Sequence, residues 1–379
     1  MSKKNDDRKN VVIVGGGWAG HLLAKALSAK LDPSRYNLIL VTARESFIHL
    51  IAAARMVVTS EGDLENQAII PYDRLFVNGN GTHVVGAVTA IDEVAPGKGG
   101  NVVLNNGEKI HYDVLALATG STWPGPINFP DSDADAIASI KDWRNKIANA
   151  KHVVIVGGGP VGIETAGEIK DAYPDKKVTL VHSEKQLVTD TYPDRWRQDI
   201  EWRVRKRGID LILDDRIDSF PAPGTIGVTT HNGKELPDAE LVIPSYGPRP
   251  NTAYIASLDP SVLTEQGFVK VNPTLEIVNH PGVFALGDII DWREQKQAAK
   301  AGNGHVPVVA TNIQGYIAGQ PLNKIYKGSP EMILVPLGRS GGSGYIGLLW
   351  GIVVGDWVTR WLKGKTLMVP AVRKQFGLS

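Results

Sequence analysis

The chain has 379 residues, with 41 Lys and Arg against 40 Asp and Glu, and it contains no cysteine. The formal charge of +1 argues against a broad electrostatic surface for nucleic acid, so no nucleic-acid partner is expected. Without cysteine there is no disulfide, no Cys-ligated zinc or iron–sulfur cluster, no thiolate nucleophile and no redox-active cysteine pair. Redox chemistry in this chain therefore has to belong to a bound cofactor.

The N-terminal residues carry no targeting signal that we recognise. Residues 1–10 are polar and of mixed charge, lack the apolar segment of a signal peptide, and have serine where N-myristoylation needs glycine. The longest apolar run, residues 345–355, is shorter than the roughly 20 residues that span a bilayer. We therefore expect a cytoplasmic protein.

An internal repeat dominates the first half of the chain. Residues 11–20 read VVIVGGGWAG and residues 153–162 read VVIVGGGPVG, so eight of ten positions match. Each copy is an apolar run that ends in G-x-G-x-x-G, which we call a fingerprint. Helices are predicted over residues 18–30 and 160–173, and second strands over residues 36–41 and 177–181. The pattern is the beginning of a βαβ unit, twice.

The three glycines of such a fingerprint have separate physical roles. The first permits a sharp turn after the strand, the second lets the backbone approach a pyrophosphate, and the third lets the helix pack on the sheet. The helix N-terminus then presents N–H groups to the phosphates. One copy alone is matched by many glycine-rich turns, but two copies in matching contexts predict two dinucleotide sites.

The acidic residue that grips a ribose diol is missing after both second strands. The first strand is followed by Thr42-Ala43-Arg44 and the second by His182-Ser183-Glu184. Loss of the carboxylate removes repulsion against a 2′-phosphate, so the sequence leaves open whether NADH or NADPH binds.

Two later motifs separate the two sites. Residues 112–120 read YDVLALATG, and residues 282–288 read GVFALGD before a second helical stretch. With these four motifs in order, the chain resembles the flavoproteins that have two dinucleotide-binding domains. The resemblance implies FAD at the first fingerprint, NAD(P)H at the second, and hydrogen bonds from Asp288 to the ribityl and phosphate part of FAD.

Together the fingerprints and the resemblance give candidate binding residues. Those for FAD are Gly15, Gly17, Trp18, Ala19, Gly20, Arg55, Val88, Thr119, Gly120, Gly287 and Asp288. Those for NAD(P)H are Gly157, Gly159, Pro160, Val161, Gly162, Glu164, His182 and Gly247. No cluster has metal-ligand spacing, so no metal site is expected.

The implied fold is α/β with two Rossmann-like dinucleotide-binding domains and a small C-terminal α+β region. The FAD-binding domain takes residues 1–121 and 252–320. The NAD(P)H-binding domain, residues 122–251, is inserted into it. Residues 321–379 form the C-terminal region, which we expect to contact a membrane or a second subunit.

Three further segments narrow the resemblance. They are similar to segments of the apoptosis-inducing-factor-like branch that includes ferroptosis suppressor protein. The three segments are residues 46–55 (SFIHLIAAAR), 334–344 (LVPLGRSGGSG) and 354–360 (VGDWVTR). That branch implies a membrane-associated NAD(P)H:quinone oxidoreductase. A ferredoxin- or monodehydroascorbate-type reductase, and a non-catalytic flavin-bound redox-sensing or death-signalling protein, remain as alternatives.

The resemblance also suggests side chains near the reacting groups. A lysine after Asp288 would stabilise negative charge on reduced flavin, with Lys296 as the candidate and Lys300 as its rival. Glu164 approaches the nicotinamide in similar proteins, but a glutamate there also complements the helix dipole. His49 and His305 are either proton donors on the quinone side or structural histidines.

The C-terminal region has an aromatic pattern. Its apolar residues recur at helical spacing, which predicts a helix with one aromatic face: Trp350, Val353, Val354, Trp357 and Trp361. Lysines and arginines flank it, as in interfacial helices beside anionic lipid. The alternatives are peripheral membrane contact and packing of this face on the core or on the second subunit of a homodimer.

Overall fold

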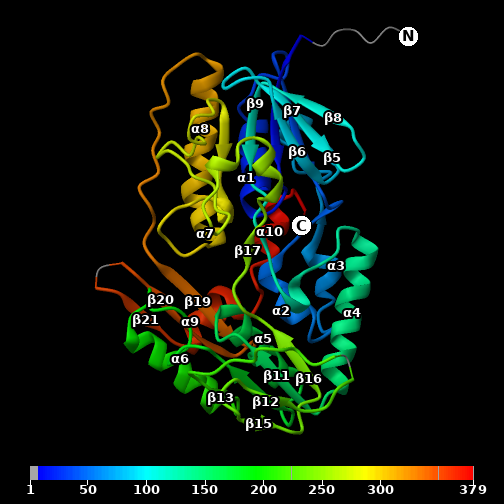
Figure 1. Ribbon diagram of the computed structural model, residues 1–379, viewed down its shortest axis with the longest axis vertical. Coiled ribbons are helices and arrows are strands. Elements are labelled where there is room, and N and C mark those ends of the chain that lie inside the picture. Colours follow the sequence, from blue (N-terminus) through cyan, green and yellow to red (C-terminus); the bar gives the residue numbers. More distant parts are fainter. Residues whose placement is uncertain (1–6, 223, 349, 379) are drawn as a thin grey trace.

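The first body of the structure is built on a five-stranded parallel sheet (Figure 1). The computed structural model describes residues 7–222, 224–348 and 350–378. The strands lie in the order β18-β9-β1-β2-β5, with β1 at the centre paired to β2 and β9. They are β1 (Lys9–Val14), β2 (Tyr36–Thr42), β5 (Thr82–Val85), β9 (Val114–Leu117) and β18 (Val283–Ala285).

Helices and a second sheet bury the central strands. A parallel sheet is covered on both faces, and accordingly Val11, Val12 and Ile13 have no exposed surface. They share one apolar core with α1 (Trp18–Ser28), with α8 (Val306–Ile317) and with an antiparallel sheet of three strands. That sheet comprises β6 (Val88–Glu93), β7 (Gly100–Leu104) and β8 (Lys109–Tyr112).

Short elements connect the strands of this body. Between β2 and β5 the chain forms β3 (Ser46–Ile48), α2 (Ala53–Met56), α3 (Leu64–Ala68) and β4 (Ile69–Pro71). After β18 come the turn η6 (Gly287–Ile289), α7 (Ala298–Lys300) and a π-helical turn, η7 (Ala301–His305), which leads directly into α8.

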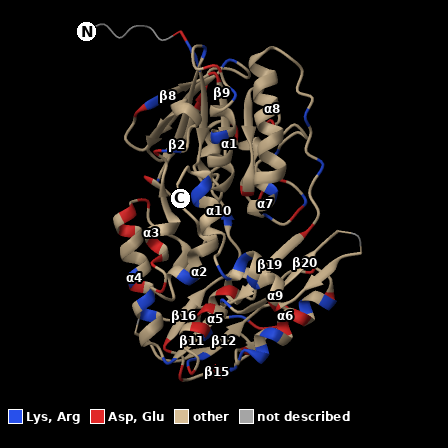
Figure 2. Ribbon diagram, turned by 180° about the vertical axis from the view of Figure 1, so that it is seen from behind, with Lys and Arg blue, Asp and Glu red and all other residues tan. Residues whose placement is uncertain are grey.

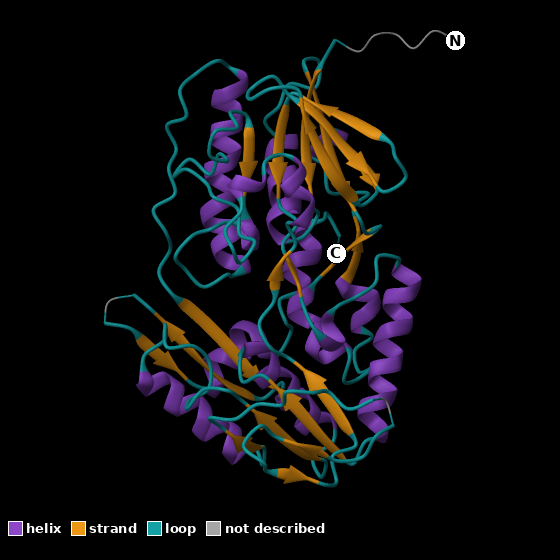
Figure 3. Ribbon diagram, in the orientation of Figure 1, coloured by secondary structure: helices purple, strands orange, loops and turns teal. Residues whose placement is uncertain are grey.

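The second body has a four-stranded parallel sheet in the order β13-β12-β11-β16 (Figure 3). The strands are β11 (His152–Val156), β12 (Lys177–Val181), β13 (Asp210–Ile212) and β16 (Leu241–Pro244). The helices are α4 (Asp133–Asn149), α5 (Pro160–Ala172) and α6 (Asp194–Lys206). A short hairpin, β14 (Val228–Thr229) and β15 (Glu235–Leu236), completes this body.

The chain passes between the two bodies on paired strands. β10 (Ser121–Thr122) leaves the first body and β17 (Arg249–Pro250) returns to it, and the two pair antiparallel. The carboxyl ends of β1 and β9 therefore lie close to both crossings.

The C-terminal region packs on the second body and then returns to the first. An antiparallel sheet of β19 (Met332–Leu337), β20 (Gly341–Ile346) and β21 (Ile352–Val354) contacts α5 and α6. It is followed by α9 (Asp356–Thr359), by a second π-helical turn, η8 (Arg360–Gly364), and by α10 (Val369–Gln375). In Figure 1, α10 lies beside α1, far from α9.

The structure confirms the α/β class and both βαβ beginnings. The predicted second strand at residues 177–181 matches β12. In the structure, α1 ends two residues and α5 one residue before the predicted helix ends at residues 30 and 173. The predicted aromatic helix is wrong for residues 350–355. Ile352, Val353 and Val354 form β21, since this β-branched run pairs with β20, and the helix begins only at Asp356.

Candidate functional site

The first fingerprint has the geometry that its glycines predict. Gly15 has φ +100°, and a Cβ on it would lie 2.5 Å from the carbonyl oxygen of Ala118. A Cβ on Gly20 would lie 1.8 Å from the carbonyl oxygen of Gly15. Gly17 is the N-cap of α1, and no described atom lies within 4 Å of the Cβ it would carry. Glycine is thus required for packing at 15 and 20, whereas the space at Gly17 is open.

The second fingerprint repeats this arrangement. Gly157 has φ +125°, a Cβ on Gly162 would lie 2.0 Å from the Gly157 carbonyl oxygen, and space around Gly159 is open in the described chain. Pro160 is the first residue of α5, a position where its missing N–H costs nothing. Each helix thus has an open N-terminus at which a pyrophosphate fits.

The residues at the ribose positions are polar but uncharged. Thr42 Oγ1 lies 2.6 Å from Nε2 of His83. His182 Nδ1 accepts the N–H of Gly158 at 3.1 Å, and burial lowers the pKa of this imidazole below its ordinary value. His182 is therefore neutral near pH 7 and supplies no fixed charge for a 2′-phosphate.

Asp288 lies at the crossing between the two bodies. Ser121 Oγ, on β10, donates to its carboxylate at 3.0 Å. Burial raises the pKa of Asp288, opposed by the Ser121 hydrogen bond and by the charge of Lys296. Beside it, the Gly287 N–H donates to His305 Nδ1 at 3.1 Å, and Thr119 Oγ1 donates to the carbonyl oxygen of Asn251 at 2.6 Å.

Neither candidate lysine has a freely exposed ammonium. Lys296 Nζ donates to the carbonyl oxygens of Ile290 at 2.7 Å and of Trp292 at 3.1 Å, and burial lowers its pKa. Lys300 is buried, with Nζ 2.6 Å from Glu331 Oε1. The charge of Lys296 is among the influences that lower the pKa of Asp288.

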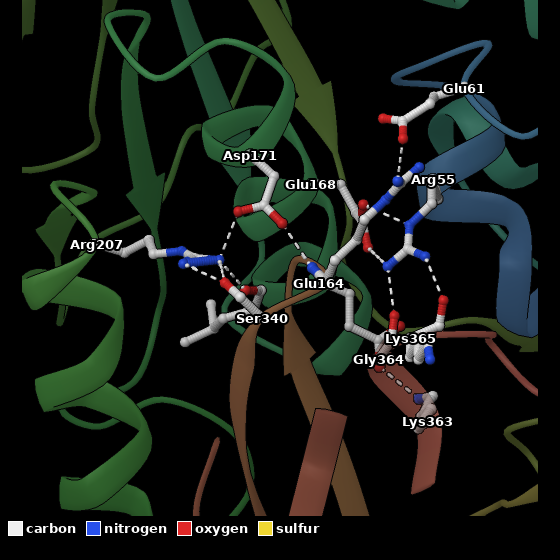
Figure 4. A network of polar contacts seen from close by, with 12 residues as sticks. Arg55, Glu61, Glu164, Glu168, Asp171, Arg207, Ser340, Lys363, Gly364 and Lys365 are labelled. Carbon is white, nitrogen blue, oxygen red and sulfur yellow. Dashed lines mark hydrogen bonds and ion pairs between the residues drawn. The ribbon is translucent and has the colours of Figure 1, made fainter. Parts of the chain in front are cut away.

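Glu164, on the first turns of α5, has a partner from the far end of the chain. Lys363 Nζ donates to Glu164 Oε1 at 2.6 Å (Figure 4). It also donates to the carbonyl oxygen of Leu334 at 3.1 Å. Both side chains are largely buried. The C-terminal turn η8 therefore touches the helix of the second fingerprint at its N-terminal end.

Arg55 is bound to protein groups on several sides. Its guanidinium donates to both carboxylate oxygens of Glu168 at 2.8 Å, and further to the carbonyl oxygens of Gly364 at 2.7 Å and Lys365 at 3.4 Å (Figure 4). Arg55 is 2% exposed and Glu168 4%. Figure 2 shows the basic band of α2 and the acidic bands of α5 that form this junction.

The network extends along α5. Arg207 and the backbone N–H of Arg339 both donate to Asp171, and Arg207 also reaches Ser340. Arg339 contacts Glu61 in turn. Sequence reasoning missed Glu168, Asp171 and Lys363. Glu164, Glu168 and Asp171 follow the three- and four-residue spacing of one helix face, and that signal was available.

The other candidate residues lie around these groups. Trp18 opens α1, and its ring centroid is 5.9 Å from that of His49. His49 Nε2 donates to the Leu367 carbonyl oxygen at 2.7 Å, and burial lowers its pKa to about 4, so it is neutral. Among the remaining candidates, Ala19 is buried and Gly247 is exposed. The other three are half-buried: Val88, Gly120 and Val161.

The tryptophans of the C-terminal region point into solvent. Trp350 is 92% exposed, Trp357 75% and Trp361 70%. The rings of Trp357 and Trp361 stack, with centroids 6.4 Å apart and an interplanar angle of 4°. Leu348, Ile352 and Leu362 are exposed nearby in the sequence. None of these three indoles packs on the core, and the stacked rings of Trp357 and Trp361 form an exposed aromatic surface.

Comparison with known proteins agrees with this geometry. Residues 9–304 match the pyridine nucleotide-disulphide oxidoreductase family. The FAD-dependent oxidoreductase FVFD30 of Flammulina velutipes is 47% identical over 324 residues, which are 86% of this chain and 100% of that protein. Ferroptosis suppressor protein 1 of Mus musculus is 33% identical over 368 residues, 95% of this chain and 94% of that protein.

A solved structure shares the fold. The sulfide:quinone oxidoreductase of Aquifex aeolicus superposes with a TM-score of 0.76 at 18% identity, covering 97% of this chain and 92% of that one. The resemblance expected from the sequence is thereby confirmed, for the fold by this structure and for the branch by the relatives.

Proposed function

This chain belongs to the pyridine nucleotide-disulphide oxidoreductase family, and we propose that within it the protein passes electrons from NAD(P)H through FAD to a quinone. It is an FAD-dependent NAD(P)H oxidoreductase. The disulphide of the family name has no counterpart here, since the chain has no cysteine. The chain therefore offers no cysteine pair that could relay electrons, and the acceptor would be a separate molecule.

We propose that the first fingerprint holds FAD and the second holds NAD(P)H. When bound, FAD takes a hydride from NAD(P)H and gives up two electrons to the acceptor. The open N-termini of α1 and α5 would bind the two pyrophosphates. Asp288, held by Ser121, would bind the ribityl side, and the charge of Lys296 would stabilise negative charge that develops on the cofactor.

Glu164 and Lys363 would work as one unit at the nicotinamide. The carboxylate is fixed by the ammonium 2.6 Å away, so its position does not depend on solvent. Lys363 is itself fixed by the Leu334 carbonyl oxygen. This pair would orient the nicotinamide and exclude water from the place of hydride transfer.

The observation that carries the choice of a quinone is the position of the exposed aromatic surface. Trp361 belongs to η8, the turn that presents Lys363 to Glu164, and Trp357 lies on α9 directly before it. An apolar acceptor dissolved in a membrane would thus arrive near the N-terminal end of α5, the helix of the second fingerprint. The similar protein of Aquifex aeolicus is a sulfide:quinone oxidoreductase, which supports the same class of acceptor.

We further propose that this surface rests on a membrane. Tryptophans suit the interface between headgroups and acyl chains, and Lys365 is exposed close to Trp361 in the sequence. In the described parts of the chain, every helix is too short or too polar to cross a bilayer. Contact through side chains at one surface is the arrangement that this leaves for membrane association, and a homodimer through the same surface is the alternative.

The proposed domain division follows the two sheets. Residues 1–121 and 252–320 would form the FAD-binding domain, since the first sheet takes β1, β2, β5, β9 and β18. Residues 122–251 would form the NAD(P)H-binding domain around β11, β12, β13 and β16, and residues 321–379 the C-terminal region.

Stopped-flow absorbance on the purified protein tests the function. NADH or NADPH should bleach the flavin, and a short-chain ubiquinone or a naphthoquinone should restore its colour much faster than oxygen does. If neither nicotinamide bleaches the flavin, the oxidoreductase assignment fails. If reoxidation by quinones is no faster than by oxygen while a ferredoxin or the ascorbate radical is fast, the quinone assignment fails.

A further inference from the structure

The last helix of the chain ends against the first fingerprint. Phe376, directly after α10, has no exposed surface. Its ring centroid lies 4.7 Å from that of His21, 5.1 Å from that of Phe47 and 5.9 Å from that of Tyr72. Gln375 Oε1 lies 3.2 Å from His21 Nε2, and Lys25 donates to the Gln375 carbonyl oxygen. Residues 375 and 376 thus contact side chains of α1, β3 and the segment after β4.

Two of those side chains hold the fingerprint itself. Tyr72 OH donates to the carbonyl oxygen of Gly16 at 2.9 Å. His21 Nδ1 donates to the carbonyl oxygen of Gly17 at 3.0 Å. Tyr72 packs so closely on Gly16 that a Cβ there would lie 2.2 Å from its hydroxyl oxygen. Phe376 packs against both Tyr72 and His21, and Gln375 contacts Nε2, the second ring nitrogen of His21.

The direction of these carbonyls determines where the neighbouring N–H groups point. In a planar trans peptide the C=O and the N–H face opposite ways. Holding the Gly16 and Gly17 oxygens toward Tyr72 and His21 therefore turns the N–H groups of Gly17 and Trp18 to the other side. Those two N–H groups belong to the open N-terminus of α1, where a pyrophosphate needs donors.

We propose that Gln375 and Phe376 are positioning residues for the first fingerprint, and that retention of FAD depends on this C-terminal tail. The inference rests on the proposed assignment of FAD to that fingerprint. The tail would act through its contacts with Tyr72 and His21. A tail that only fills the core would change the stability of the protein without changing the affinity of the folded protein for FAD.

The affinity of the deflavinated full-length protein for FAD distinguishes these two roles. It is measured through the quenching of flavin fluorescence on binding. Phe376→Ala should raise the FAD dissociation constant about tenfold, and Tyr72→Phe, which removes one hydroxyl and keeps the packing, should raise it several-fold. Lys374→Ala, an exposed residue of the same helix, is the matched control and should bind FAD like the wild type.

Folding is measured in the same samples by circular dichroism and thermal unfolding. If Tyr72→Phe and Phe376→Ala are folded and bind FAD as tightly as Lys374→Ala, the proposal is overturned. If Phe376→Ala does not fold, Tyr72→Phe alone decides in the same way.

NADH binding to the same variants distinguishes this inference from the proposed function. Weaker NADH binding with unchanged FAD binding would mean that the first fingerprint holds the nicotinamide nucleotide, which refutes both the assignment and the inference. The FAD dissociation constant does not depend on the electron acceptor, so failure of the quinone assignment leaves the result for the tail unaffected.

Discussion

The ammonium of Lys363 and the carboxylate of Glu164 lie 2.6 Å apart although 199 residues separate them in the sequence. Glu164 belongs to the helix of the second fingerprint and Lys363 to the π-helical turn η8. π-Helical turns often occur at functional positions in proteins. The C-terminal region is thus part of the candidate site.

Replacement of Glu164 by glutamine should slow flavin reduction by NAD(P)H about tenfold, a loss of about 1.4 kcal/mol of transition-state stabilisation. The amide keeps the size of the side chain but no longer binds Lys363 by charge. The rate of flavin bleaching in a stopped-flow instrument measures this, and the FAD content should be unchanged. Glu265→Gln, on an exposed loop, is the control. Equal rates for the two variants would remove Glu164 from the site.

Single replacement of Arg55 by methionine should destabilise the protein by about 3–5 kcal/mol, because Glu168 would be left as a buried unpaired charge. The double variant Arg55→Met/Glu168→Leu should recover much of this loss, since it removes both charges. Chemical denaturation of the three proteins measures the free energies of unfolding. A double variant no more stable than Arg55→Met would show that Arg55 matters mainly through the Gly364 and Lys365 carbonyls.

Alanine at the two open fingerprint positions should separate the two cofactors. Gly17 and Gly159 have room for a methyl group within the described chain, so Gly17→Ala and Gly159→Ala should fold. The methyl group would occupy the space for a pyrophosphate. Gly17→Ala should lose FAD, whereas Gly159→Ala should keep its yellow colour and bind NAD(P)H weakly.

The packing glycines provide the contrast. Gly20→Ala and Gly162→Ala should be poorly folded, because each new Cβ would lie about 2 Å from a backbone oxygen.

For the two open positions, loss of FAD from Gly159→Ala, with FAD retained by Gly17→Ala, would reverse the assignment of the two fingerprints.

Stability should fall as the pH is lowered from 6.5 towards 4. Burial lowers the pKa values of both His21 and His49 to about 4, against 6.5 in the unfolded chain. In this range the unfolded state binds more protons, so protonation favours unfolding. At pH 5 the cost is about 2 kcal/mol for each histidine. Denaturation at pH 7 and pH 5 tests this, and a His21→Gln/His49→Gln variant should lose less on acidification. The same loss in both proteins would contradict the prediction.

Replacement of the exposed tryptophans should weaken membrane contact. Trp357→Ser/Trp361→Ser should bind less to vesicles that contain anionic lipid, with little effect on stability because both indoles are exposed. Cosedimentation measures the binding. Trp202→Ser, an exposed tryptophan on α6, is the control. If the double variant and the control bind equally well, the exposed aromatic surface is not the membrane contact. The oligomeric state of the protein should then be measured, because a homodimer through this surface is the alternative.

The sequence was sufficient for features that depend on local physics. Backbone sterics and periodicity predict the glycine positions, the apolar strands and the helices that follow them. The structure confirmed the α/β fold that these features indicate. The spacing of Glu164, Glu168 and Asp171 indicates one acidic helix face, but it does not show which distant cations meet that face, so the pairs with Lys363 and Arg55 could not be predicted. The same limit applies to Phe376, whose neighbours come from residues 21, 47 and 72.

The error in the C-terminal region has a local cause. Trp350, Trp357 and Trp361 are spaced as on a helix, yet Gly351 has φ +77° and the run Ile352-Val353-Val354 prefers the extended form. Pairing of that run with β20 decides its conformation. Helical spacing of side chains therefore grouped Trp357 and Trp361 correctly, whereas Val353 and Val354 are half-buried in β21.

The order of the strands also affects how the chain matures on the ribosome. All strands of the second sheet come from residues 152–244, whereas the first sheet needs β18, at residues 283–285, to be complete. The second body is thus able to fold during translation while the first body still lacks the edge strand β18. Residues 375 and 376 are synthesised after every strand of both sheets, so their contacts with His21 and Tyr72 form only once both sheets can be complete. If the first fingerprint holds FAD as proposed, FAD is accordingly expected to enter after the sheets have formed.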